Sequence, residues 1–309
     1  MEKSTIRKPD FIMIGAAKSG TTTIYQYLLN HPDIYLTTPK EPDFFAVDRI
    51  YEQGLQYYQS LFADAKENQI CGEASTTYSR LHQHPQTLLR MKEYIPQTTK
   101  FIYIMRHPID RAYSFYTYRF KASIADPELA EYRNEFIEAK TFEEAIEETS
   151  EYIDSSLYLY QIEQYLQYYP RESFLFLEMD ELIKFPQDTI SKVINFLGLT
   201  TPDGFFNSEM IVANKREEFP EWYMRSQLKL KLEKIPIINN LLDFLPQNLK
   251  SSLFQIWKNN NFDNWQKKQA QYLPPPMLEE TRKILIEKFS EPNEKLAQFL
   301  GKDLSHWSK

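Results

Sequence analysis

With 309 residues, 42% of them hydrophobic and 26% charged, the chain has the length and balance of one soluble globular domain, not of a disordered or membrane-spanning protein. Its net charge of -7 argues against a nucleic-acid partner, because phosphate backbones are bound by basic faces. The single cysteine, Cys71, excludes an internal disulfide, and the charged start lacks a secretory signal pattern, so we expect a cytoplasmic protein.

Three short apolar runs, each followed by a helical pattern, recur along the chain. Their strand and helix pairs are 10–15 with 22–30, 100–106 with a helix opening at Pro108, and 173–178 with 187–196. Buried strands that alternate with helices are typical of parallel sheets. The sequence therefore predicts a P-loop-like three-layer α/β fold, with a central, mostly parallel sheet flanked by helices.

The remaining segments complete a single domain over 1–309. Helical patterns occur at 142–149 and 157–169, and two closing helices are predicted over 277–289 and 293–300. Between them, 221–276 holds an apolar cluster interrupted by prolines, which exclude one long helix. We interpret this piece as a helical insertion or lid near the C-terminus.

The turn after the first predicted strand runs from Gly15 to Thr22. It combines glycines, a helix start, Lys18 and hydroxyl side chains, which together predict a phosphate site. An ATP-type loop needs lysine directly after the second glycine, yet Thr21 follows Gly20 in this chain. This spacing disfavours an ATP-dependent, kinase-like P-loop enzyme, which remains an alternative together with a non-catalytic nucleotide-binding module.

A second anion motif follows the strand at 100–106. Arg106 ends that strand as a fork-shaped donor, and Ser114 lies two helical turns further on. This motif and the segment 15–22 with its following His31-Pro32 resemble the sulfotransferase superfamily, in the branch of heparan sulfate and bacterial carbohydrate sulfotransferases. The resemblance implies transfer of a sulfuryl group from 3′-phosphoadenosine 5′-phosphosulfate (PAPS), with 3′-phosphoadenosine 5′-phosphate (PAP) as product and no metal.

The resemblance assigns the first loop to the 5′-phosphosulfate and the second motif to the 3′-phosphate. It adds Lys215 and Arg216, although these two are adjacent in this chain, whereas the family's basic loop has a Lys-Gly-Arg order. The expected donor-binding residues are Ala17, Lys18, Ser19, Gly20, Thr21, Thr22, Arg106, Ser114, Lys215 and Arg216.

The segment 39–45 resembles the family's catalytic-base segment, which implies Glu41 as the general base in an in-line displacement. Lys18 would stabilise the leaving oxygen, and Lys40 would orient the sulfonate. Shielding by the aromatic pair Phe44 and Phe45 is expected to raise the proton affinity of Glu41.

The segment 72–78 resembles the acceptor side of the family's pocket. It implies substrate contacts for Glu73, Ser75 and Tyr78, although hydroxyl residues of this kind often bond only local backbone. His82 or His84 remains a lesser alternative base, because another branch of the superfamily uses histidine. The expected acceptor is a saccharide, glycolipid or small alcohol, and neither its identity nor the oligomeric state can be read from the sequence.

Overall fold

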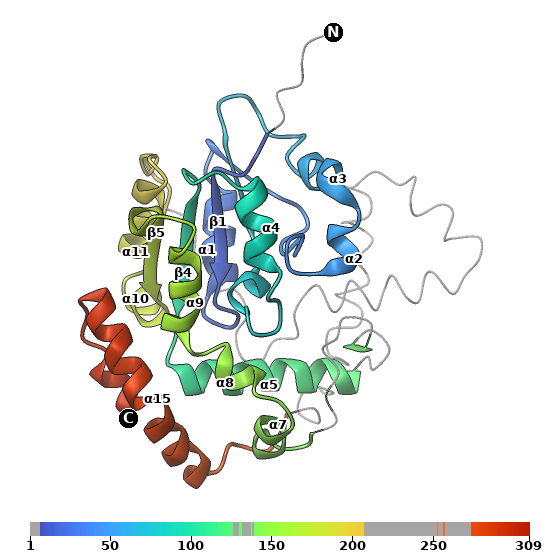
Figure 1. The fold of residues 1–309 in the computed structure, drawn as a ribbon. Helices are drawn as coiled ribbons and strands as arrows, with labels where there is room; N and C mark the ends of the chain where they lie inside the picture. Colours follow the sequence, from blue (N-terminus) through green and yellow to red (C-terminus); the bar gives the residue numbers. More distant parts are fainter. Residues whose placement is uncertain are drawn as a thin grey trace.

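The computed structural model describes residues 7–125, 130, 131, 137, 139–206, 252, 256 and 273–309. A five-stranded sheet with strand order β2-β3-β1-β4-β5 forms its centre, and every pairing is parallel (Figure 1). The strands are β1 (Phe11–Gly15), β2 (Ile34–Leu36), β3 (Ile70–Ala74), β4 (Lys100–Met105) and β5 (Phe174–Glu178). The predicted parallel α/β fold is confirmed.

Helices cover both faces of the sheet and its carboxyl edge. They are α1 (Thr21–Leu29), α2 (Asp48–Tyr51), α3 (Gly54–Ser60), α4 (Thr87–Tyr94), α5 (Pro108–Ala125), α7 (Phe142–Glu148), α8 (Glu151–Asp154), α9 (Tyr158–Leu166), α10 (Met179–Lys184), α11 (Pro186–Phe196) and α15 (Glu279–Leu300). The described 3₁₀ turns are η1 (Thr76–Ser79), η2 (Arg171–Ser173) and η4 (Ser305–Ser308).

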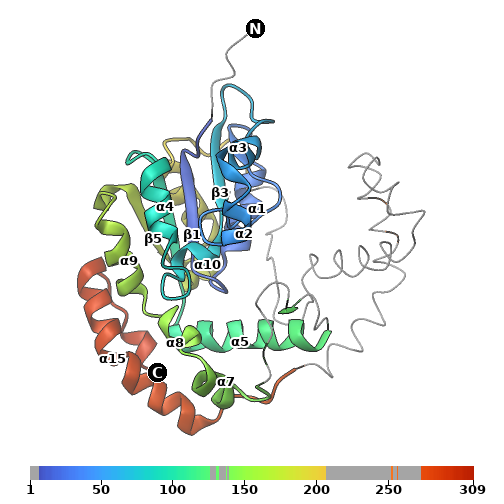
Figure 2. The same ribbon diagram turned by 45° about the vertical axis from the view of Figure 1, so that its right-hand side comes forward.

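Two apolar cores hold the layers together. On one face, side chains of α1 and α11 pack on the sheet, and on the other, those of α3, α4 and α9 do so. Figure 2 shows α4 and α1 on opposite sides of β1. β4 has five fully buried apolar residues in a row, the pattern of a strand covered on both faces. Each such side chain stabilises the fold by roughly 1.5–3 kcal/mol relative to its exposed state.

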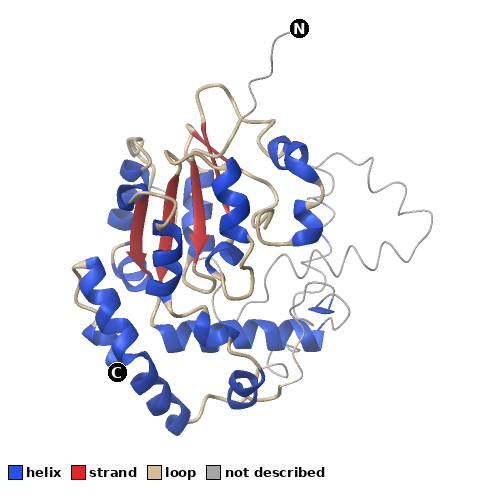
Figure 3. Cartoon of the chain, in the orientation of Figure 1, coloured by secondary structure: helices blue, strands red, loops and turns tan. Residues whose placement is uncertain are grey.

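Helix α5 lies across the carboxyl ends of the strands, toward which the arrowheads in Figure 3 point. It begins at Pro108, whose fixed φ suits a first helical position, directly after β4. A third core, formed with α7, α8 and α15, holds α5 in this place. The loops that leave β1, β3 and β4 therefore meet at one edge beside α5.

Two expectations differ from the structure. The two closing helices are one helix, α15, which continues through Pro292 because its buried residues Leu285, Phe289 and Leu296 keep one face packed on both sides of the proline. Strand β2 was not predicted, because three residues give too short a pattern.

The expected insertion 221–276 lies almost entirely outside the described residues. Within the described ranges, no helix has the length and apolar character needed to span a bilayer.

Candidate active site

The β1–α1 turn has the backbone geometry of an anion loop. Gly20 precedes α1 with φ 96°, a left-handed conformation that favours glycine, and a Cβ there would lie 3.1 Å from Leu182 Cδ2. The amides of Gly20, Thr21 and Thr22 have no hydrogen-bond acceptor within the described part of the chain. These donors point out of the amino end of α1, where an anion is favoured.

Two side chains of this turn, those of Ser19 and Lys18, are also available to an anionic ligand. The Ser19 hydroxyl is fully buried and has no hydrogen-bond partner among the described residues. The Lys18 ammonium lies 4.5 Å from the centre of the Tyr118 ring on α5. Burial lowers the pKa of Lys18 to about 8; the Glu41 charge opposes this, and Arg106 and other cations add to it.

Four charged side chains lie close enough to Lys18 to act on its pKa. They are the carboxylate of Glu41 and the cations of Arg106, Lys121 and Lys40. Around Lys18 the cations outnumber the carboxylates. This local excess of positive charge in an acidic chain favours an anionic ligand.

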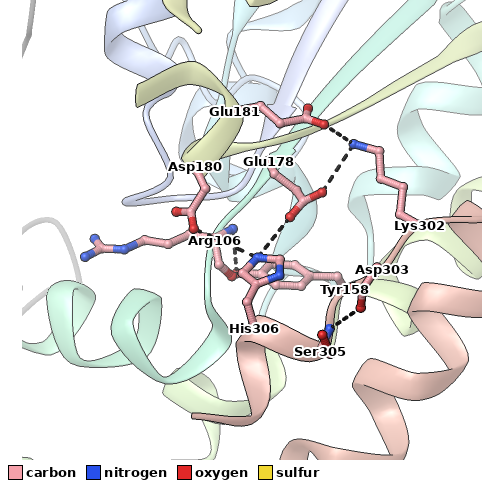
Figure 4. Close-up of polar contacts among 9 residues, drawn as sticks. All are labelled: Arg106, Tyr158, Glu178, Asp180, Glu181, Lys302, Asp303, Ser305 and His306. Atoms are coloured by element: carbon pink, nitrogen blue, oxygen red, sulfur yellow. Dashed lines mark hydrogen bonds and ion pairs between the residues drawn. The ribbon is translucent and has the colours of Figure 1, made fainter. Parts of the chain in front are cut away.

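Arg106 joins the second motif to the first. Its Nη1 donates a hydrogen bond to the Lys18 carbonyl oxygen over 3.3 Å. The Tyr158 hydroxyl of α9 donates to the Arg106 carbonyl oxygen over 2.7 Å and fixes the end of β4 (Figure 4). Ser114 lies on α5, half-buried, and none of its described contacts links it to Arg106.

A cavity of about 360 Å³ adjoins Arg106. The residues of the β1–α1 turn do not line it, so the two motifs meet through the Arg106–Lys18 hydrogen bond and not through this cavity. Its charged and titratable lining comes from the β4–α5 connection, α5, α10, α15 and the C-terminal segment, and comprises Arg106, His107, Asp110, Asp180, Lys184, Arg282, His306 and Lys309.

The C-terminal segment closes this end of the sheet. Lys302 Nζ lies 3.3 Å from Glu178 Oε1 at the end of β5 and 2.7 Å from Glu181 Oε1 on α10. His306 Nε2 approaches the other Glu178 oxygen at 3.3 Å, and Figure 4 shows both contacts converging on this carboxylate beside Arg106. The segment therefore attaches α15 to the edge on which the anion motifs lie.

Glu41 and Lys40 lie at the same edge, and their side chains form an ion pair. The Glu41 amide donates to the Ala74 carbonyl oxygen over 2.9 Å, and the Thr76 hydroxyl donates to Glu41 Oε2 over 3.3 Å. Burial raises the pKa of Glu41, but the Lys40 charge and the hydrogen bonds from Lys40 and Thr76 outweigh it, so this pKa lies below its usual value. The expected increase in proton affinity is wrong, because the ion pair dominates over the shielding.

Asp43 is a second carboxylate in the same loop. The Thr77 hydroxyl donates to Asp43 Oδ1 over 2.5 Å, and the Asp43 amide donates to Ser75 Oγ over 3.1 Å. Burial and then the charge of Glu41 raise the pKa of Asp43 to about 7, against the opposing effect of Thr77. Sequence reasoning missed this residue, although its spacing of two from Glu41 was visible.

The three residues expected to contact the acceptor lie deeper than a substrate surface. Glu73 is fully buried within β3 and accepts a hydrogen bond from Tyr58 over 3.0 Å. Burial raises the pKa of Glu73 to about 8. Ser75 and Tyr78 are also fully buried, and both accept hydrogen bonds from backbone amides of the loop 40–45. In this geometry Ser75 and Tyr78 hold the loop 40–45 in place from the interior of the protein.

His82 and His84, the alternatives to Glu41 as the base, both make contacts within the fold. His82 stacks on Tyr160 with ring centres 4.2 Å apart, and His84 Nδ1 lies 3.2 Å from the Ala46 carbonyl oxygen.

Two residues expected at the donor site, Lys215 and Arg216, lie outside the described residues. Lys121 on α5, which the sequence reasoning did not select, lies near enough to Lys18 for its charge to lower the Lys18 pKa, a relationship that only the tertiary structure sets.

Three features meet at one edge of the parallel sheet: the β1–α1 loop with its free amides and Lys18, Arg106 directly after β4, and the carboxylate loop. They define a P-loop-like α/β protein with an anion-binding edge. A family model described as sulfotransferase domain matches residues 8–214, more than half of the chain. The chain belongs to the sulfotransferase family.

Its relatives include the human heparan sulfate glucosamine 3-O-sulfotransferase 6, 30% identical over 62% of this chain and 53% of the relative. The human 3-O-sulfotransferase 3A1 is 27% identical over 71% of this chain and 51% of its own length. The chain thus spans about half the length of the curated relatives it matches. A sulfotransferase from Alicyclobacillus acidocaldarius shares the fold, with a TM-score of 0.61 and 20% identity over 98% of this chain and 100% of that one.

Proposed function

We propose that this chain transfers a sulfuryl group from PAPS to a hydroxyl or amine of a saccharide. The observation that carries the proposal is a group of cations at one sheet edge: Arg106 is hydrogen-bonded to the Lys18 carbonyl oxygen, Lys40 is paired with Glu41, and Lys121 lies near enough to Lys18 for its charge to lower the Lys18 pKa. Arginine and lysine held in a partly buried site bind phosphate and sulfate groups more strongly than exposed ones do. Membership of the sulfotransferase family supports this choice over the kinase-like alternative.

The residues present fit such a donor. The free amides at the start of α1 and the unpartnered Ser19 hydroxyl would hold the 5′-phosphosulfate, and Arg106 would hold the 3′-phosphate. When bound, PAPS supplies the sulfuryl group and a phosphate that leaves with negative charge. Lys18, at the centre of the turn, would stabilise that charge.

The carboxylate loop would supply the general base. Glu41, fixed by Lys40 and Thr76, and Asp43, fixed by Thr77, lie at the edge where the acceptor must meet the donor. A positioned base contributes about 10²–10⁴-fold to the rate of such a transfer. We therefore assign the base to the pair, of which the sequence reasoning had selected Glu41 alone.

A saccharide acceptor is supported by the names of the relatives, which sulfate heparan glucosamine at the 3-O position. A local excess of cations also reduces the repulsion between an acidic chain and an acidic glycan. The acceptor would approach the open side of the loop 40–43.

Two measurements test the proposal. PAP without magnesium should raise the melting temperature of the protein, whereas ATP with magnesium should not. Labelled sulfate should then pass from PAPS to heparan sulfate or to another oligosaccharide in a screened set. Stabilisation by ATP with magnesium alone would support the kinase-like alternative, and PAP binding without transfer to any acceptor would indicate a non-catalytic module.

A further inference from the structure

The Tyr158 hydroxyl of α9 bonds both backbone polar groups of Arg106 (Figure 4). It donates to the Arg106 carbonyl oxygen over 2.7 Å and accepts from the Arg106 amide over 3.4 Å. Arg106 comes directly after β4, where the strand has ended, so its peptide groups need partners outside the regular ladder. One side chain therefore fixes the backbone from which the Arg106 side chain extends.

Tyr158 also lies next to the β1–α1 turn. Burial raises the pKa of Tyr158, and the groups near enough to oppose this increase include Arg106 and Ser19. These two residues belong to the two different anion motifs, which are already joined by the hydrogen bond from Arg106 to the Lys18 carbonyl oxygen. Tyr158 is thus placed at the point where the two motifs meet.

The C-terminal segment packs on this tyrosine. The rings of Tyr158 and Trp307, the latter from η4, have centres 5.8 Å apart, and both side chains are only 2% exposed. Tyr103 of β4 also contacts Tyr158, edge to face, with ring centres 5.9 Å apart. Close packing by both the sheet and η4 leaves the Tyr158 hydroxyl little freedom to move away from Arg106.

Ion pairs attach η4 to the same edge of the sheet. His306 of η4 approaches Glu178 Oε2 at 3.3 Å, and Lys302 lies 3.3 Å from the other oxygen of this carboxylate. Glu178, the last residue of β5, is the register partner of Met105, the last residue of β4. The C-terminal segment therefore acts on the strand ends from which the second anion motif begins.

We propose that Tyr158 and Trp307 are positioning residues of the donor site. Trp307 holds Tyr158 in place, and Tyr158 fixes the direction in which Arg106 presents its guanidinium to the 3′-phosphate. A planar, fork-shaped donor binds phosphate best in one orientation, so a small rotation of the backbone at Arg106 would misalign it. In this role neither aromatic residue needs to touch the donor. The inference rests on the proposed function, in which Arg106 binds PAPS and PAP.

Removal of the Tyr158 hydroxyl alone tests the link. Tyr158→Phe keeps the packed ring and should raise the Kd of PAP about three- to tenfold, the range for one lost hydrogen bond, with a much smaller change for AMP. Tyr165→Phe is the matched control, because Tyr165 is a fully buried residue of the same helix whose hydroxyl donates to the Tyr78 carbonyl oxygen over 2.9 Å. It should leave the ratio of PAP to AMP affinity unchanged. The same change of this ratio in both variants would overturn the proposal.

A double variant shows whether the effect passes through Arg106. In an Arg106→Ala background, Tyr158→Phe should cause no further loss of PAP affinity, because the group that it positions is gone. Additive losses would contradict the proposal, since Tyr158 would then act on the ligand independently of Arg106.

Two substitutions of Trp307 test its part. Trp307→Phe leaves a ring that packs on Tyr158, so PAP affinity should stay close to the wild-type value, whereas Trp307→Ala should lower it at least as much as Tyr158→Phe does. Wild-type PAP affinity in a folded Trp307→Ala protein would remove Trp307 from the proposal. If Trp307→Ala fails to fold, Trp307→Leu, which fills more of the same space without a ring, takes its place.

A measurement without any ligand separates this inference from the proposed function. Hydrogen exchange of the Arg106 amide should be faster in Tyr158→Phe than in the wild type and unchanged in Tyr165→Phe, because the Tyr158 hydroxyl accepts from that amide. Unchanged exchange in Tyr158→Phe would overturn the positioning role even if the wild-type chain binds PAP. Faster exchange in a chain whose wild type binds no PAP would instead refute the proposed function, and with it the role of Arg106 that Tyr158 serves.

Discussion

The Arg106 guanidinium donates a hydrogen bond to the Lys18 carbonyl oxygen, and this contact links the ends of the neighbouring strands β1 and β4. The two anion motifs are 88 residues apart in sequence, yet they form one continuous edge. A ligand with an anionic group at each end can contact both motifs without any rearrangement of the sheet.

Removal of Arg106 should weaken PAP binding selectively. Arg106→Ala should cost about 1.5–3 kcal/mol for PAP, the range for a lost charged hydrogen bond, and much less for AMP, which lacks the 3′-phosphate. Isothermal titration calorimetry measures both ligands. Arg171→Ala, at the amino end of β5 away from this edge, should leave both affinities unchanged. An equal loss for PAP and AMP would contradict the assignment of the 3′-phosphate to Arg106.

Lys18 should make PAP binding depend on pH. Its pKa of about 8 in the free protein means that the ammonium loses its proton as the pH rises through this value. An anion beside it favours the charged form, so binding near pH 8.5 should take up a proton, and affinity should fall above pH 8. Calorimetry in buffers of different ionisation enthalpy measures this uptake. Lys18→Met should abolish the uptake; if the uptake persists in that variant, another group is responsible.

Much of the fold could be predicted from the sequence. The apolar runs that became β1, β4 and β5 lie between helices and are buried on both faces, so their patterns are strong. Strand β2 and the continuity of α15 could not be predicted, because each depends on packing against distant elements. Pro292 predicts a helix end locally, but the packed face of α15 overrides it.

The candidate site was only partly predictable for a similar reason. Lys18, Glu41 and Arg106 belong to motifs with their own local signature, and the structure brings them together. The balance of charge between Glu41 and Asp43 depends on which hydroxyl reaches which oxygen, and sequence spacing does not specify that. Burial of Glu73 likewise depends on aromatic residues from other elements.

Glu73 should make the stability of the fold decrease with pH. Burial raises its pKa from 4.5 to about 8, so between these values the folded state binds more protons than the unfolded state. The stabilisation is therefore complete below pH 4.5 and lost as the pH rises through about 8. Glu73→Gln imitates the protonated form, so it should be more stable than the wild type at pH 8.5, by on the order of a few kcal/mol.

Urea unfolding of both proteins at pH 5 and pH 8.5 checks this prediction. Glu93→Gln, at an exposed position of α4, serves as the control and should show the same difference from the wild type at both values. If the difference between Glu73→Gln and the wild type does not change with pH, Glu73 is already ionised in the folded protein at pH 5, and burial does not keep its carboxyl group protonated.

Lys302 should stabilise the fold far more than a surface lysine of the same helix region. It pairs with Glu178, whose side chain is only 8% exposed, so Lys302→Met leaves a buried carboxylate with His306 as its remaining partner and should cost about 1–3 kcal/mol. Lys295 pairs with Glu291 one turn away on α15, and both side chains are well exposed. Lys295→Met should therefore change the free energy of unfolding by less than about 0.5 kcal/mol.

Urea unfolding measures the effect of both substitutions. Adding Glu178→Gln to Lys302→Met should recover most of the lost stability, because it removes the unpaired charge. Equal costs for the two lysines, or no recovery in the double variant, would show that the C-terminal segment is attached by its apolar contacts alone.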